Sequence, residues 1–120
     1  MRLVLSVVGR PRGDLAPAIA EYEQRAARYW PLAVREVREE SARGQAAGQV
    51  LAREGERLLE AVPVGATLVA CDERGEQWTS ARFAEWLQRA REAARDVAFV
   101  IGGAYGLAAA VRERATVRLA

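Results

Sequence analysis

Short apolar runs rich in β-forming residues alternate with longer amphipathic segments along the whole chain. The runs are RLVLSVV (residues 2–8), LAVREVRE (32–39), ATLVAC (66–71) and VAFVI (97–101), and TVRLA (116–120) reads as the start of a fifth. Each intervening segment carries apolar residues at spacings of three and four, which predicts helices. Strands that alternate with helices of this length take right-handed crossovers. We therefore predict an α/β fold with a mostly parallel sheet and helices on both faces.

The composition of each run predicts its place in the sheet. Residues 2–8 and 97–101 are almost wholly apolar, as in strands that are covered on both faces. Residues 32–39 alternate apolar and charged side chains, which indicates a half-exposed strand near a sheet edge. Residues 72–75 follow the third strand and are expected to form a loop.

Capping and breaking residues mark the helices. Asp14 is the expected cap of the first helix, which Pro31 closes, and Thr79 is the expected cap of the third. The second helix covers residues 49–62 and contains Gly55, which costs about 1 kcal/mol relative to alanine. Such a glycine is typical of close packing. A fourth helix is expected over residues 107–115.

The length and composition predict one globular domain, residues 1–120, since 51% of the residues are hydrophobic and 28% are charged. No apolar run approaches the roughly 20 residues of a membrane span, so we expect no membrane partner. The apolar stretch near the N-terminus is read as a strand, not as a signal peptide. A single cysteine, Cys71, cannot form an internal disulfide and favours a cytoplasmic location.

All 18 basic residues are arginine, and the chain has no lysine, asparagine or histidine. Arginine suits phosphate and would fit a nucleic-acid partner. A coding bias or a thermostable lineage explains the same composition, because 16 acidic residues leave a net charge of only +2. The absence of histidine removes the commonest general base and metal ligand, and one cysteine cannot make a zinc site. We expect no metal.

The stretch IGGAYGL (residues 101–107) is the strongest local signal for a site. Ligands of parallel sheets bind beyond the carboxyl ends of the strands, which are the turns after Val8, Cys71 and Ile101. Three glycines, Gly102, Gly103 and Gly106, let main-chain N–H groups approach a ligand. The spacing fits neither a P-loop nor a dinucleotide fingerprint. Read locally, the stretch is either a compact structural turn or a ligand loop.

Two neighbouring residues, Cys71 and Asp72, carry chemical groups that could serve a site. Asp72 follows the third strand, where its carboxylate either accepts hydrogen bonds from a ribose or an amine, or caps a surface turn. Cys71 ends an apolar strand, and no histidine is present to activate it. It is therefore expected to be inert.

Four stretches together resemble one family, that of ribosomal RNA large subunit methyltransferase H. They are EYEQR (residues 21–25), REGERLL (53–59), CDERGEQWTS (71–80) and IGGAYGL (101–107), in the order that the family shows. The resemblance covers essentially all 120 residues. This family belongs to the SPOUT class of knotted α/β methyltransferases.

The resemblance implies a cytoplasmic homodimer that uses S-adenosylmethionine to methylate N3 of a pseudouridine in 23S ribosomal RNA on the assembled ribosome. By motif position, Cys71 stands where the family usually has a leucine beside the adenosyl group, and Gly102 at a glycine that contacts the cofactor. Gly103 and Gly106 complete the expected cofactor-binding set. Deprotonation of N3 needs a base, and no catalytic residue is assigned.

The resemblance also implies a segment of roughly thirty residues beyond the position of Ala120, which in the family closes the knot and supplies one wall of the cofactor pocket. We therefore expect a fold that lacks this segment and is C-terminally incomplete. Two alternatives to the methyltransferase remain open: a non-catalytic RNA- or ribosome-binding remnant of the fold, and an unrelated small nucleotide-binding domain. The intact mass of the natural product distinguishes a fragment from a natural truncation.

Overall fold

Five parallel strands form a single sheet in the order β2-β1-β4-β3-β5. The computed structural model describes residues 1–120. In chain order the elements are β1 (Leu3–Val8), the short helix η1 (Gly13–Leu15), α1 (Ala16–Ala27), β2 (Leu32–Val37), α2 (Ala47–Glu60), β3 (Thr67–Glu76), α3 (Ser80–Glu92), β4 (Val97–Ile101), α4 (Ala109–Arg114) and β5 (Val117–Leu119). No helix has both the length and the apolar character that crossing a lipid bilayer requires.

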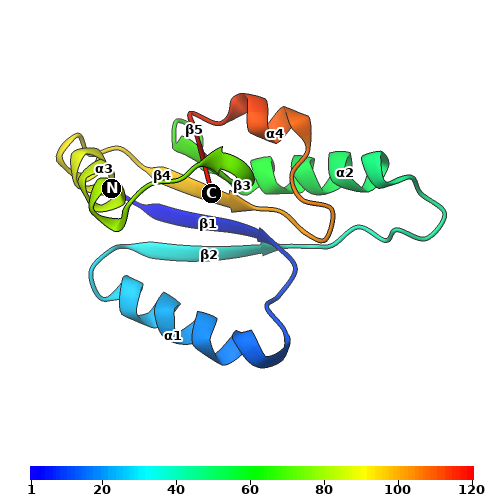
Figure 1. Cartoon of the computed structure of the whole chain (residues 1–120), viewed down its shortest axis with the longest axis horizontal. Coiled ribbons are helices and arrows are strands. Elements are labelled where there is room, and N and C mark those ends of the chain that lie inside the picture. Colours follow the sequence, from blue (N-terminus) through cyan, green and yellow to red (C-terminus); the bar gives the residue numbers. More distant parts are fainter.

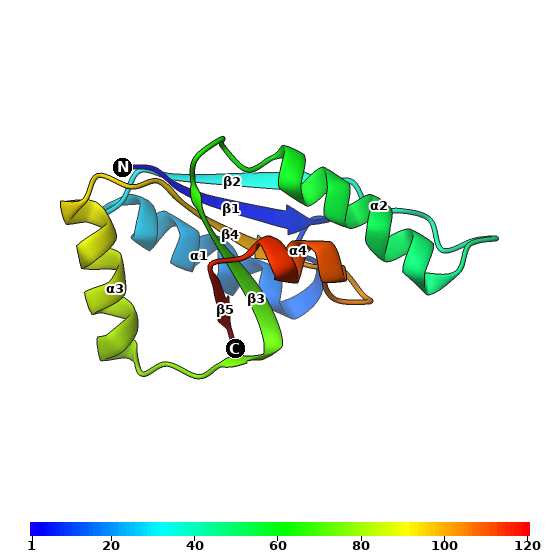
Figure 2. The same cartoon turned by 90° about the horizontal axis from the view of Figure 1, so that it is seen from above.

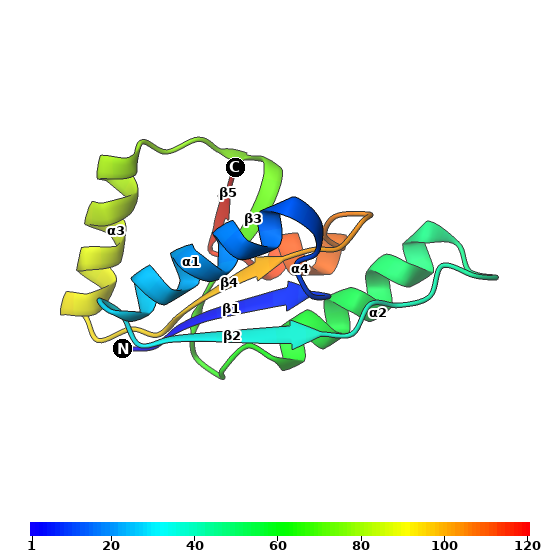
Figure 3. The ribbon, with the colours of Figure 1, turned by 90° about the horizontal axis from the view of Figure 1, so that it is seen from below.

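The helices cover both faces of the sheet. In Figure 1, α2 and α4 lie on one side of the strands and α1 lies on the other. Figure 2, seen from above, shows α4 beside α2, and Figure 3, seen from below, shows α1 in front of the strands and α3 at the end of the sheet near the N-terminus. The predicted α/β architecture with a parallel sheet is therefore confirmed.

Two hydrophobic clusters fill the layers between helices and sheet. The Val4 cluster lies under α2 and α4, and its buried members are Val4, Leu58, Leu68, Ala70, Ala98, Val100, Leu107 and Val111. The Leu3 cluster lies on the α3 side, and its buried members are Leu3, Val69, Leu87, Ala90, Val97 and Phe99. Strand β4 supplies side chains to both clusters, which is why its sequence is uninterrupted by polar residues.

Helix α1 packs less closely than the others. It contains no buried residue, and Tyr22 is 67% exposed. An apolar groove of about 560 Å³ lies between α1 and the strands, lined among others by Leu5, Val7, Ile19 and Ile101. The α1 face of the sheet is thus only partly covered by the helix.

The predicted elements agree with the structure in their main features. Residues 97–101 form β4 as expected, β2 is an edge strand, and β5 follows α4. The hydroxyl oxygen of Thr79 accepts the Arg82 N–H at 3.1 Å, so Thr79 caps α3 as predicted.

Three local predictions were wrong. Asp14 caps no helix, because the turn η1 intervenes and α1 begins at Ala16 with a proline in its first turn. The helix bounds also differ: α4 begins at Ala109, where about Leu107 was expected, and α2 spans Ala47–Glu60, where residues 49–62 were expected. Residues 72–75 continue β3 instead of forming a loop, because the chain shifts register after Cys71 and pairs again with β5 at Glu76.

Gly55 marks close packing of α2 against the start of α4, as predicted. It is buried in α2, and a Cβ added there would lie 3.1 Å from the Ala108 Cβ and 3.2 Å from Val111 Cγ2. Gly48 lies on the same helix, is exposed, and a Cβ there would meet nothing within 4 Å. The two glycines therefore form a matched pair.

We predict that Gly55→Leu lowers the free energy of unfolding by about 1–3 kcal/mol, because the larger side chain pushes α4 away from α2. Gly48→Leu is expected to be neutral or slightly stabilising, since leucine is the better helix former. Urea denaturation followed by circular dichroism measures both. Equal stability of the two variants would contradict the close packing described here.

Candidate functional site

A cleft of about 400 Å³ lies at the carboxyl edge of the sheet, beside the ends of β3 and β4. It is lined by residues 71–74 and 101–107 and by Arg112. Its volume falls in the range of about 300–1,000 Å³ that is usual for small-molecule sites. The four residues expected from the sequence all line this cleft: Cys71, Gly102, Gly103 and Gly106.

Main chain, not side chains, shapes the turn after β4. The Gly106 N–H donates to the Gly103 carbonyl at 3.0 Å, and Gly106 has a φ of +85°. A Cβ on Gly102 would collide with the carbonyl group of Gly106. Any side chain at position 102 therefore forces the turn apart, whereas a Cβ on Gly106 would meet nothing within 4 Å, so the turn leaves open space at Gly106.

Cys71 ends the regular part of β3 and pairs in register with Ile101. Its half-buried side chain packs against the Leu3 cluster. Burial raises the pKa of the Cys71 thiol above its ordinary value. The thiol is therefore protonated at neutral pH, which suits a packing residue and not a nucleophile.

Asp72 and Arg112 connect the two walls of the cleft. The Asp72 carboxylate accepts the Arg74 N–H at 3.1 Å and lies 3.7 Å from Arg112 Nε. Arg112 also donates to the Leu107 carbonyl, at the end of the glycine turn. Asp72, which the sequence offers as an acceptor for a ribose or an amine or as the cap of a turn, lines the cleft. Arg112 was missed, because nothing local distinguishes it among 18 arginines.

The turn after Val8 does not line the cleft, unlike the turns after Cys71 and Ile101. Residues 8–11 line the apolar groove beside α1 and not the cleft. Val8 does support the glycine turn, since its Cγ1 lies 3.0 Å from the position of a Cβ on Gly103. Of the three turns considered from the sequence, the structure brings together those after β3 and β4.

Behind the glycine turn lies a carboxylate that sequence reasoning also missed. Glu54 is only 4% exposed, and its Oε1 lies 3.1 Å from the position of a Cβ on Gly103. A signal was present in the sequence. Glu54 stands four residues from both Val50 and Leu58, so it falls on the buried stripe of α2.

Comparison with known proteins gives a consistent result over the whole chain. The family model described as "Predicted SPOUT methyltransferase" matches residues 1–120. The chain is 58% identical to the Ribosomal RNA large subunit methyltransferase H of Gemmatimonas aurantiaca, covering 99% of this chain and 78% of that protein. It is 49% identical to the protein of that name from Rhodospirillum centenum, covering 100% and 78% of the two chains.

We predict that Cys71 reacts with iodoacetamide at pH 8 at least about tenfold more slowly than a free cysteine, because its burial raises the thiol pKa and restricts access. In urea the difference should vanish. The rate is measured by mass spectrometry of the alkylated protein. A folded protein that reacts as fast as free cysteine would mean that the thiol is activated, contrary to its packing.

Proposed function

Since the chain belongs to the SPOUT methyltransferase family, we propose that it methylates ribosomal RNA of the large subunit with S-adenosylmethionine as methyl donor. The observation that carries the proposal is the position of two motif stretches, residues 71–80 and 101–107. They are far apart in sequence, yet their first residues line the two walls of one cleft. The relatives named above carry the same activity in their names.

The cleft fits the adenosyl part of the cofactor. A Cβ on Gly106 would meet nothing within 4 Å, so the turn leaves open space there, and its peptide groups can donate to and accept from an adenine ring at short distance. The Asp72 carboxylate lines the same cleft, where it can accept hydrogen bonds from ribose hydroxyls. Cys71 contributes through its main chain, because its side chain packs into the Leu3 cluster.

When bound, S-adenosylmethionine supplies a methyl group on a positively charged sulfur, which is transferred by in-line displacement. Such a reaction depends mainly on alignment and on the exclusion of water. The turn between β4 and α4 provides the alignment, since its shape is fixed by main-chain contacts between Gly102, Gly103 and Gly106. No reactive nucleophile is required of the protein, consistent with a half-buried and protonated Cys71.

The finer parts of the proposal come from the family resemblance. We propose that the target is N3 of a pseudouridine in 23S ribosomal RNA on the assembled ribosome, and that the protein acts in the cytoplasm as a homodimer. The N3 proton must leave before or during transfer. The chain has no histidine for this step, and we assign no residue as the base.

The methylation assay uses the protein as its gene encodes it, tritiated S-adenosylmethionine and ribosomes that lack the modification. We expect label in 23S RNA, and N3-methylpseudouridine among the nucleosides after digestion. Absence of label in 23S RNA would contradict the proposed methyltransferase activity. If the protein instead binds RNA in a salt-sensitive way without binding the cofactor, it is a non-catalytic remnant of the fold.

We predict that Gly102→Ala weakens the binding of S-adenosylmethionine at least about tenfold, equivalent to about 1.4 kcal/mol, because the added Cβ displaces Gly106 from the wall of the cleft. Gly48→Ala is the control, since its Cβ meets nothing within 4 Å. Isothermal titration calorimetry measures both affinities. Unchanged affinity in Gly102→Ala would return the turn to a purely structural role.

A further inference from the structure

Glu54 is the only buried side chain whose polar atoms are not all hydrogen-bonded. Its Oε2 accepts the main-chain N–H of Glu40 at 3.0 Å, whereas its Oε1 has no partner. Leaving a buried acceptor unpaired costs about 1–3 kcal/mol, and more when the group is charged. An apolar residue of similar length would avoid that cost, so packing alone does not account for a glutamate here.

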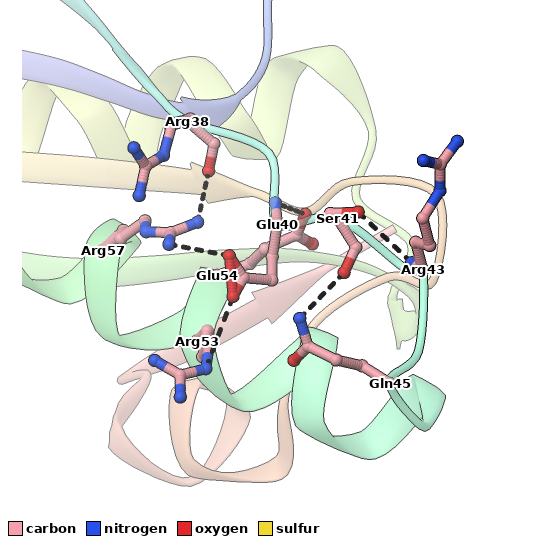
Figure 4. A network of polar contacts seen from close by, with 8 residues as sticks. All are labelled: Arg38, Glu40, Ser41, Arg43, Gln45, Arg53, Glu54 and Arg57. Carbon is pink, nitrogen blue, oxygen red and sulfur yellow. Dashed lines mark hydrogen bonds and ion pairs between the residues drawn. The ribbon is translucent and has the colours of Figure 1, made fainter.

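The Oε2 atom of Glu54 is hydrogen-bonded to the segment between β2 and α2, and this segment is itself anchored to α2 through Glu40. Figure 4 shows Glu40 contacting two arginines of α2: Arg57 Nη2 donates to its Oε1 at 3.0 Å, and Arg53 Nε lies 3.4 Å from its Oε2. Arg57 also donates to the Arg38 carbonyl at 3.0 Å. The Arg57 guanidinium holds the pKa of Glu40 below its ordinary value, so this anchor persists in mildly acidic solution. The peptide that binds Glu54 Oε2 is thereby fixed in place.

The other oxygen is directed at the candidate cofactor turn. Oε1 lies 3.1 Å from the position that a Cβ on Gly103 would occupy, and Oε2 lies 3.5 Å from it. Gly103 therefore rests on the carboxylate, and it also lines the cleft on its other side. Gly103 alone therefore separates the proposed cofactor from Glu54 Oε1, an acceptor that has no hydrogen-bond donor.

We propose that Glu54 is a positioning residue for the cofactor turn: its Oε1 accepts a main-chain N–H of residues 103–104 when the turn closes on S-adenosylmethionine. This inference rests on the proposed function. It explains why a carboxylate with one fixed and one unpaired oxygen lies beneath a turn that has no side chains of its own to hold it. Glu54 acts through the turn and does not touch the reacting atoms.

The test is Glu54→Gln. Glutamine has a single side-chain carbonyl oxygen, and the Glu40 N–H requires it as acceptor. The NH2 group of the glutamine then faces the turn, where it cannot accept a main-chain N–H. We expect the affinity for S-adenosylmethionine, measured by calorimetry, to fall about tenfold. Glu56→Gln is the matched control, because Glu56 lies on the same helix and is exposed, and its affinity should equal that of the unmodified protein.

Amide hydrogen exchange provides a second readout that a merely structural role would not change. In the unmodified protein, the cofactor should slow the exchange of an amide in residues 103–104, and in Glu54→Gln this protection should be lost. Gly103→Ala tests the same contact from the other side, since its Cβ would press on Glu54 Oε1 and Val8 Cγ1. It should also weaken binding, and the double variant should lose less affinity than the sum of the two single losses.

The possible outcomes distinguish the role of Glu54 from the proposed function. If the unmodified protein binds S-adenosylmethionine and Glu54→Gln binds it equally well, the role of Glu54 is wrong and the proposed function stands. If the unmodified protein does not bind the cofactor, the proposed function fails and this inference fails with it. Should Glu54→Gln fail to fold, hydrogen exchange of the unmodified protein decides: without protection of an amide in residues 103–104 by the cofactor, the role of Glu54 is wrong.

Discussion

The parallel pairing of β4 with β1 on one side and β3 on the other is the constraint on which the rest of the structure depends. Val97, Ala98 and Val100 are completely buried, and Phe99 is 8% exposed. A strand covered on both faces cannot shift its register without moving every side chain to the opposite face. Its last residue therefore has a fixed position, and so does the glycine turn that follows. The candidate site inherits its geometry from the most buried strand of the sheet.

Those parts of the fold that depend on simple periodicity could be predicted from the sequence. The run at residues 97–101 contains only apolar residues, which requires burial on both faces, and the charged residues within 32–39 indicate an exposed edge strand, as observed for β2. Thr79 was predictable as a cap because its hydroxyl and the Arg82 N–H are close in sequence. Local chemistry was sufficient in each of these cases.

Other parts depend on contacts between segments that are far apart in sequence. The extension of β3 beyond Cys71 requires β5 as a pairing partner, and Gly75 permits it because a Cβ there would lie 2.6 Å from the Arg118 backbone. No pattern within residues 72–76 reveals that neighbour. The same holds for the cleft: Cys71 and the three glycines were found through motifs and strand ends, whereas Arg112 was not, because its function lies in joining Asp72 to the Leu107 carbonyl.

A site built from peptide groups needs support from outside itself, and this requirement connects the cleft to α2. Glycines at positions 102 and 103 let the turn pack closely, and Gly106 leaves open space beside the main chain, but the three glycines also remove the side chains that would otherwise hold the turn by packing. On the side away from the cleft, the turn meets the Val8 side chain and the Glu54 carboxylate. The Val8 side chain makes only van der Waals contact, which has no preferred direction, whereas a carboxylate oxygen accepts hydrogen bonds in a defined geometry. An acceptor fixed by Glu40 and two arginines can therefore determine where the peptide groups of the turn point, which packing against valine cannot do.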